Sequence, residues 1–89
     1  MIQIRVFTHP VCKTCPAAIK LAESMAKLYP DVEVRVISLG SPQGREEAKR
    51  EGILSVPTIL VEHHRFVGLP ERAALIRTIE QARREAENT

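Results

Sequence analysis

Residues 2–15, IQIRVFTHPVCKTC, combine a strand pattern with both cysteines of the sequence. Apolar side chains recur at every second position from Ile2 to Val6, and this period predicts a β-strand over residues 2–8. We expect residues 9–11 to form a short loop, because the residue before a proline is pushed out of the α-helical region. The chain therefore opens with a strand that leads through a loop to two cysteines at the start of a helical pattern.

Beyond this opening, helical and strand patterns alternate along the chain. The expected elements are, in order, a helix from about Cys12 to Tyr29, a strand at 32–36, a short polar helix at about 43–51, strands at 56–61 and 65–68, and a helix that opens at Leu69-Pro70. We expect residues 62–64 to form the turn between the last two strands and residues 85–89 to fray.

The predicted order, βαβαββα, restricts the topology. The short β–α–β crossover implies parallel strands joined by a right-handed connection. The brief link between the last two strands implies an antiparallel hairpin. The sequence thus predicts a single α/β domain over residues 1–89, with a four-stranded mixed sheet flanked by three helices.

Length and composition exclude several classes of protein. A chain of 89 residues allows one domain, and its 44% hydrophobic and 27% charged residues exclude a disordered or disulfide-dense scaffold. The formal net charge of +2 is too balanced to suggest a nucleic-acid or membrane partner, and no apolar run approaches the roughly 20 residues that cross a bilayer. The first residues carry no signal-peptide pattern, so we expect the chain in the cytoplasm, where thiols are kept reduced. We also expect a monomer.

Cys12 and Cys15 are the two cysteines of the sequence, and they lie three positions apart at the start of a predicted helix. A helix N-terminus carries partial positive charge and free N–H groups, which favour a thiolate over a thiol. Lys13 and His9 would add to this effect if their side chains point inward. The spacing places Cys15 one helical turn behind Cys12, close enough for a disulfide. Thiol–disulfide exchange needs such a pair, in which one exposed sulfur attacks and one sheltered sulfur resolves.

Two other interpretations of this cysteine pair stay open. Two cysteines at this spacing supply half of a zinc site, and a dimer could complete a four-thiolate site. The sequence has no second pair, and we expect His63 and His64, adjacent in a predicted turn, to be solvent-exposed and not to face one metal. The other interpretation, two buried structural cysteines, fits poorly beside a loop and a lysine. We therefore favour redox chemistry and expect neither a metal nor another cofactor.

A proline at the start of a predicted strand is the second feature, within residues 52–61, GILSVPTILV. Proline has no N–H for the ladder of a sheet, so Pro57 can be a strand-initiating residue at an edge. Alternatively the Val56–Pro57 bond is cis, a rare and purposeful geometry. That geometry would leave the Val56 backbone groups free to pair with an extended substrate.

The cysteine pair, residues 52–61 and the string Phe66-Val67-Gly68 together resemble the thioredoxin family, and most of all the small archaeal-type thioredoxins. The resemblance covers roughly residues 2–82. It implies the thioredoxin fold, a cis Val56–Pro57 bond that faces the disulfide, Cys12 as nucleophile and Cys15 as resolving cysteine. It also implies substrate contacts at Val56, Pro57 and Gly68.

The resemblance implies a protein disulfide oxidoreductase that reduces disulfide-containing client proteins and is regenerated by a thioredoxin reductase-type enzyme or a low-molecular-weight thiol. One alternative is a glutathione-dependent glutaredoxin, but residues 68–72, GLPER, replace the Gly-Gly-Asp with which glutaredoxins bind glutathione. Another is a metal-binding or iron–sulfur protein that uses the same cysteines. Two positions depart from the thioredoxin pattern: Val11 stands where tryptophan is usual, and Val6 where an aspartate is usually buried.

Overall fold

The computed structural model describes residues 1–87 and confirms the predicted order βαβαββα. Its elements are β1 (Ile2–Thr8), α1 (Cys15–Leu28), β2 (Val32–Ser38), α2 (Pro42–Glu51), β3 (Thr58–Val61), β4 (His64–Val67) and α3 (Arg72–Glu87). The sheet order is β2-β1-β3-β4, in which β1 runs parallel to β2 and antiparallel to β3, and β4 pairs antiparallel with β3. The predicted four-stranded mixed sheet with three helices is therefore confirmed.

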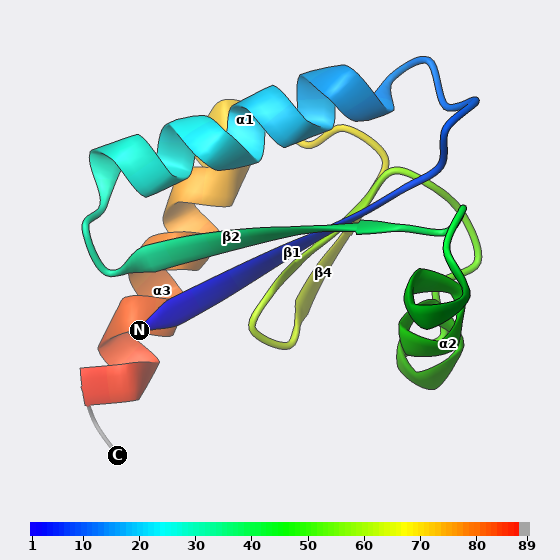
Figure 1. Cartoon of the computed structure of the whole chain (residues 1–89). Helices are drawn as coiled ribbons and strands as arrows, with labels where there is room; N and C mark the ends of the chain where they lie inside the picture. The colour runs from blue at the N-terminus through cyan, green and yellow to red at the C-terminus, as the bar shows by residue number, and fades with distance from the viewer. Residues whose placement is uncertain (88–89) are drawn as a thin grey trace.

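The sheet has helices on both faces, and each face has its own core (Figure 1). On one face α1 and α3 pack against the sheet through apolar residues of all these elements: Ile2, Ile4, Val6, Ala18, Ala22, Met25, Val32, Ile59, Val61, Leu75, Ile79 and Ala82. On the other face α2 covers a smaller cluster of Phe7, Ile37, Ala48 and Leu60. The alternation in β1 explains this division, because successive side chains of a strand point to opposite faces.

Several element boundaries differ from those predicted. Helix α1 begins at Cys15 and not near Cys12, since residues 12–14 belong to the loop ahead of it. Strand β3 begins at Thr58 and not at residue 56, because Pro57 has no N–H to give to the ladder. Helix α3 continues through residues 85–87, which we expected to fray; the rest of that tail, residues 88–89, lies outside the described residues.

Helix α2 is polar, and charged side chains hold it to its face of the sheet. Arg5 on β1 donates to Glu47 and Glu51 of α2 at 3.1 and 2.9 Å, and Arg35 on β2 donates to Glu47 at 3.3 Å. The register places Arg5 opposite Arg35, so guanidinium groups from neighbouring strands share one carboxylate. The side chains of Arg5 and Glu47 are only 17% and 16% exposed, and solvent therefore screens this pair less than it screens surface pairs.

The ion pairs of Glu47 make the fold sensitive to acid. Burial alone would raise the pKa of Glu47, but the hydrogen bond from Arg5 and the charge of Arg35 outweigh it and lower the pKa below its ordinary value. A carboxyl group with a lower pKa in the folded chain stabilises the fold above its unfolded pKa of about 4.3. That contribution is lost as the pH falls through the folded pKa.

We predict that Glu47→Gln lowers the free energy of unfolding by about 1 kcal/mol at neutral pH, because a charge-assisted hydrogen bond is lost. The same variant should show a shallower loss of stability below about pH 5, since the group that titrates is gone. Urea denaturation across this pH range measures both effects. Glu46→Gln is the matched control, because Glu46 is 73% exposed and, within residues 1–87, forms an ion pair only with Arg50 of its own helix. An acid profile of Glu47→Gln identical to that of the parent would contradict the prediction.

Candidate functional site

The cysteine pair follows the carboxyl end of β1, a strand that is interior to the sheet: Cys12 lies in the loop after β1, and Cys15 is the first residue of α1. Local hydrogen bonds fix the loop that precedes it. The Cys12 N–H donates to the carbonyl oxygen of His9 at 3.0 Å, and the Val11 N–H donates to Nδ1 of the same histidine at 3.3 Å. Pro10 restricts the loop further through its fixed φ. These contacts therefore hold Cys12 at a defined position in the loop ahead of helix α1.

Cys12 and Cys15 form a disulfide, with their Cα atoms 5.5 Å apart. Cys15, the first residue of α1, is 3% exposed, whereas Cys12 is half-buried. The backbone N–H of Cys15 donates to Cys12 Sγ at 3.1 Å, so a free N–H of the first helical turn points at the more accessible sulfur. The first turn of α1 contains no acidic residue that would oppose negative charge there. This arrangement favours a thiolate at Cys12 once the disulfide is reduced.

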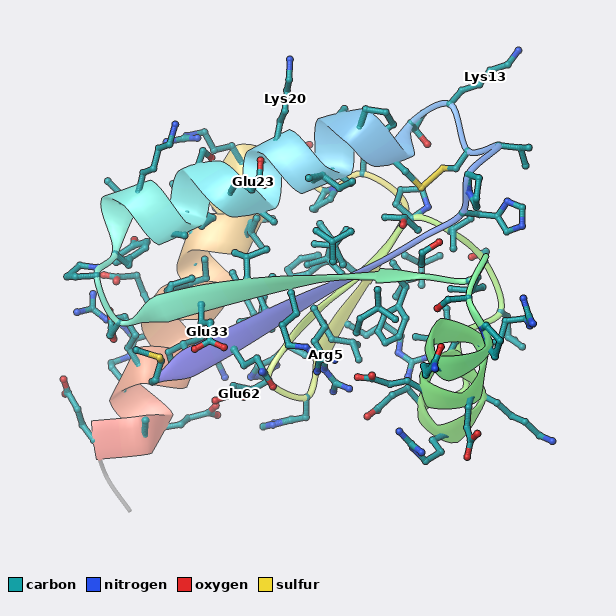
Figure 2. All side chains as sticks on the ribbon, viewed as in Figure 1. Arg5, Lys13, Lys20, Glu23, Glu33 and Glu62 are labelled. Atoms are coloured by element: carbon teal, nitrogen blue, oxygen red, sulfur yellow. A yellow bond between two sulfur atoms is a disulfide. The ribbon has the colours of Figure 1, made fainter. Side chains whose placement is uncertain are left out.

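The two side chains that could have added to this effect lie elsewhere. Figure 2 shows Lys13 extending from the loop into solvent, away from the disulfide. The ring of His9 accepts the Val11 N–H, and within residues 1–87 no side-chain hydrogen bond joins it to the Cys12 sulfur. The hydroxyl of Thr14, a residue that no sequence pattern singled out, lies 3.8 Å from Cys12 Sγ. The backbone, and not a neighbouring cation, is therefore what faces the sulfur.

The Val56–Pro57 peptide bond is cis, as the resemblance implied. It lies at the same end of the sheet as the cysteine loop, because Thr58 pairs with Phe7 near the end of β1. Pro57 is buried, Val56 is half-buried, and the Val56 backbone forms no hydrogen bond within the described part of the chain. The Gly68 N–H donates to the Pro57 carbonyl oxygen at 2.8 Å. The three residues predicted to contact substrate thus lie on two neighbouring backbone segments, which this hydrogen bond joins.

Exposed apolar side chains border these segments. Val11, next to the cysteine pair, is 80% exposed, and Leu54, just ahead of the cis bond, is 98% exposed. Val67 and Leu69, on either side of Gly68, are 68% and 51% exposed. Apolar surface favours removal from water, and exposed apolar residues gathered around one feature are typical of interaction sites. These four exposed apolar side chains could therefore be buried against another protein.

The core contributes no acid to this site. Val6, at the position where the resemblance places an aspartate, is fully buried among apolar residues. Among the described residues, the buried polar side chains are Thr8 and Thr58, whose hydroxyls donate to backbone carbonyl oxygens of Ile37 and Ser55. Within residues 1–87, the buried core therefore contains no carboxylate side chain that could accept a proton from Cys15.

A profile of the thioredoxin domain matches residues 2–80. A thioredoxin of Methanocaldococcus jannaschii is 37% identical over 82 residues, which cover 90% of this chain and 94% of that protein. The chain belongs to the thioredoxin family. A probable thioredoxin of Methanothermobacter thermautotrophicus is 35% identical over 80 residues, which cover 89% of this chain and 93% of that protein. The predicted likeness to thioredoxins of archaeal type is thereby confirmed.

Solved thioredoxin structures share the fold. Thioredoxin 1 from Thermosipho africanus has a TM-score of 0.76 at 23% identity and covers 98% of this chain and 99% of its own. A mutant thioredoxin from Halobacterium salinarum has a TM-score of 0.77 at 25% identity, and the match covers 90% of this chain and 73% of that protein.

Family membership and the Cys12–Cys15 disulfide make the chain a thioredoxin-type disulfide oxidoreductase. Its partners are, in general terms, disulfide-bearing clients and a reductase. The glutaredoxin and metal-binding alternatives are not favoured. Within residues 1–87, every helix is too short or too polar to span a bilayer.

The geometry predicts unequal reactivity of the two thiols. In the reduced protein at about pH 7, Cys12 should react with iodoacetamide at least about fivefold faster than free cysteine, because its thiolate accepts the Cys15 N–H. Cys15 should react more slowly than Cys12, since it is buried. Mass spectrometry of peptides from a timed alkylation series measures both rates. Equal rates at the two cysteines, both no faster than free cysteine, would contradict the stated role of the helix end.

Proposed function

We propose that Cys12 is the attacking sulfur and Cys15 the resolving sulfur in the reduction of client protein disulfides. The observation that supports this most directly is the Cys15 N–H aimed at the half-buried Cys12 sulfur, while Cys15 itself is buried. An attacking sulfur must be accessible and anionic, and a resolving sulfur must be close but shielded from other disulfides. Cys12 is the more accessible sulfur and accepts a backbone N–H, whereas Cys15 is buried.

The proposed exchange has two steps. The Cys12 thiolate attacks one sulfur of the client disulfide, which forms a mixed disulfide and releases the other client sulfur as a thiolate. Cys15 then loses its proton and attacks the Cys12 sulfur, which releases the second client thiolate and forms the Cys12–Cys15 disulfide seen in the structure. Two electrons pass from the dithiol to the client.

Val56, Pro57 and Gly68 are proposed to hold the client backbone beside Cys12. The Val56 N–H and C=O have no partner within the described chain, so they can pair with an extended segment. Gly68 has φ of 87°, a region that favours glycine, and a Cβ built on it would meet no atom within 4 Å. A client backbone can therefore approach closely at Gly68.

The remaining assignments follow from the same proposal. A thioredoxin reductase-type enzyme or a low-molecular-weight thiol would return the disulfide to the dithiol. We further propose that the chain works as a single thioredoxin-like domain over residues 1–89, as a monomer, in the cytoplasm. The absence of a Gly-Gly-Asp sequence at residues 68–72 supports a protein client over glutathione.

The roles of the two cysteines predict different behaviour of their serine variants. Cys15→Ser, in its reduced form, should accumulate a mixed disulfide through Cys12 with a client that carries an intact disulfide, because the resolving step is lost. Cys12→Ser should trap none, and both variants should reduce insulin only at the background rate. Non-reducing gels and peptide mass spectrometry identify the trapped adduct. A trapped adduct through Cys15, or insulin reduction by both variants as fast as by the parent, would contradict the assignment.

The identity of the reductant has its own test. The parent chain is assayed with NADPH and a thioredoxin reductase, and in parallel with NADPH, glutathione and glutathione reductase. Faster turnover with the thioredoxin reductase supports the proposal. Faster turnover with glutathione would assign the chain to glutathione-dependent exchange instead.

The exposed apolar side chain before Cys12 predicts selectivity for protein clients. Val11→Ser should slow insulin reduction about fivefold, because burial of a valine side chain against the client contributes on the order of 1 kcal/mol. Reduction of a small aromatic disulfide should stay within about twofold of the parent rate, since such a substrate needs little docking surface. Leu28→Ser is the matched control, because Leu28 is 50% exposed at the other end of α1. Equal losses for both substrates would place Val11 in the chemistry and not in docking.

A further inference from the structure

Away from the cysteines, the β3–β4 turn and the last turns of α3 bring two histidines and a glutamate together. The donor atoms of His63, His64 and Glu85 all lie within 4.8 Å of one another. The rings of His63 and His64 stack with centroids 4.4 Å apart, and His64 Nε2–H donates to Glu85 Oε1 at 3.3 Å. The other carboxylate oxygen of Glu85 accepts from Gln81 Nε2 at 3.5 Å. These residues converge although 21 positions separate His64 from Glu85.

The sequence analysis expected that the adjacent histidines would not face one metal, yet the structure brings donor atoms of both rings to within 4.8 Å of each other and of Glu85. Successive side chains on a strand point to opposite faces, but here only His64 belongs to β4, and His63 belongs to the turn before it. Glu62 has φ of 53°, a left-handed conformation that turns the chain sharply just ahead of His63. The turn therefore breaks the alternation and leaves both rings on the side of Glu85.

We propose that His63, His64 and Glu85 bind one zinc ion. Two imidazole nitrogens and one carboxylate oxygen form a donor set that zinc uses in proteins, with a fourth position left for water. Zinc–nitrogen and zinc–oxygen bonds of about 2.0–2.2 Å in a tetrahedron set neighbouring donors about 3.4 Å apart. The His64–Glu85 pair already has this spacing, at 3.3 Å. Zinc would bind the Nε2 lone pair of His64, and the Nε2 proton would move to Nδ1 of the same ring or to solvent. Rotation of the His63 side chain, whose donor atom lies within 4.8 Å of the other two, would bring in the third ligand.

Access to the three donors suits an ion that exchanges with solvent. His63 is exposed, the Glu85 side chain is 48% exposed, and the His64 side chain is 25% exposed. The site is also separate from the redox site. Val61, which precedes the turn, pairs with Ile4 in the first half of β1, whereas the cysteine loop follows the last residue of that strand. Bound zinc would tie the β3–β4 hairpin to α3 without touching Cys12.

The test uses the full, tag-free chain in its disulfide form, so that neither cysteine sulfur can bind the ion as a thiolate. Zinc sulfate is titrated calorimetrically, and the ring resonances of the histidines are followed by NMR. One equivalent of zinc should bind, and the rings of His63 and His64 should shift while that of His9, the third histidine of the sequence, stays. His63→Ala and His64→Ala should each weaken binding at least as much as the roughly 10–100-fold that loss of an outer-shell partner costs.

Matched variants separate the site from general surface binding. Glu85→Gln should weaken zinc binding, and Glu87→Gln, an exposed carboxylate near the end of the same helix, should not. His9→Ala should also bind zinc like the parent. The proposal is overturned if the oxidised chain shows no saturable binding below millimolar zinc, or if His9→Ala or Glu87→Gln weakens binding as much as the three site variants do. Because every measurement is made on the oxidised chain, its outcome is independent of the proposed roles of Cys12 and Cys15.

Discussion

In the proposed exchange, the Cys12 thiolate depends on the hydrogen bond from the Cys15 backbone N–H to Cys12 Sγ, and the packing around β1 holds this contact in place. Strand β1 pairs along its whole length with β2 and over four residues with β3. Its inward side chains share a core with α1 and α3. The strand that delivers Cys12 and the helix that supplies the N–H are thus anchored in the same cluster. Their relative position is a property of the folded core, and the short loop between them only has to connect the two.

The Val56–Pro57 segment of the site is supported by the smaller core, on the α2 face of the sheet. Val56, ahead of the cis bond, packs against the cluster of Phe7, Ile37, Ala48 and Leu60 under α2. That helix contributes little apolar surface, and Arg5 and Arg35 compensate by binding its carboxylates. A Cβ on Gly44 of α2 would overlap the Ser38 carbonyl group, so the helix also sits as close to β2 as its backbone allows. Charge and close approach therefore position the segment that is proposed to receive the client.

The sequence predicted the parts of this molecule that follow from local pattern. Alternation gave the strands, and the cysteine spacing at a helix start gave the disulfide. The cis bond at Pro57 came only from the resemblance, since the residues left two interpretations open. What the sequence missed depends on contacts between distant positions: Arg5 and Glu47 are 42 positions apart, and His64 and Glu85 are 21 apart. Side-chain direction was missed as well, because composition cannot show that Lys13 extends into solvent.

Strand β3 joins the two ends of the molecule that carry chemistry. Its first residue follows the Val56–Pro57 segment beside the cysteine loop, and its last residue precedes the turn that holds His63 and His64. All four of its residues are buried, and it pairs with strands on both sides, so it has little freedom to bend. Four residues of strand span about 13 Å. This buried spacer holds the histidine cluster too far from the cysteines for one ion to be bound by both within the same chain.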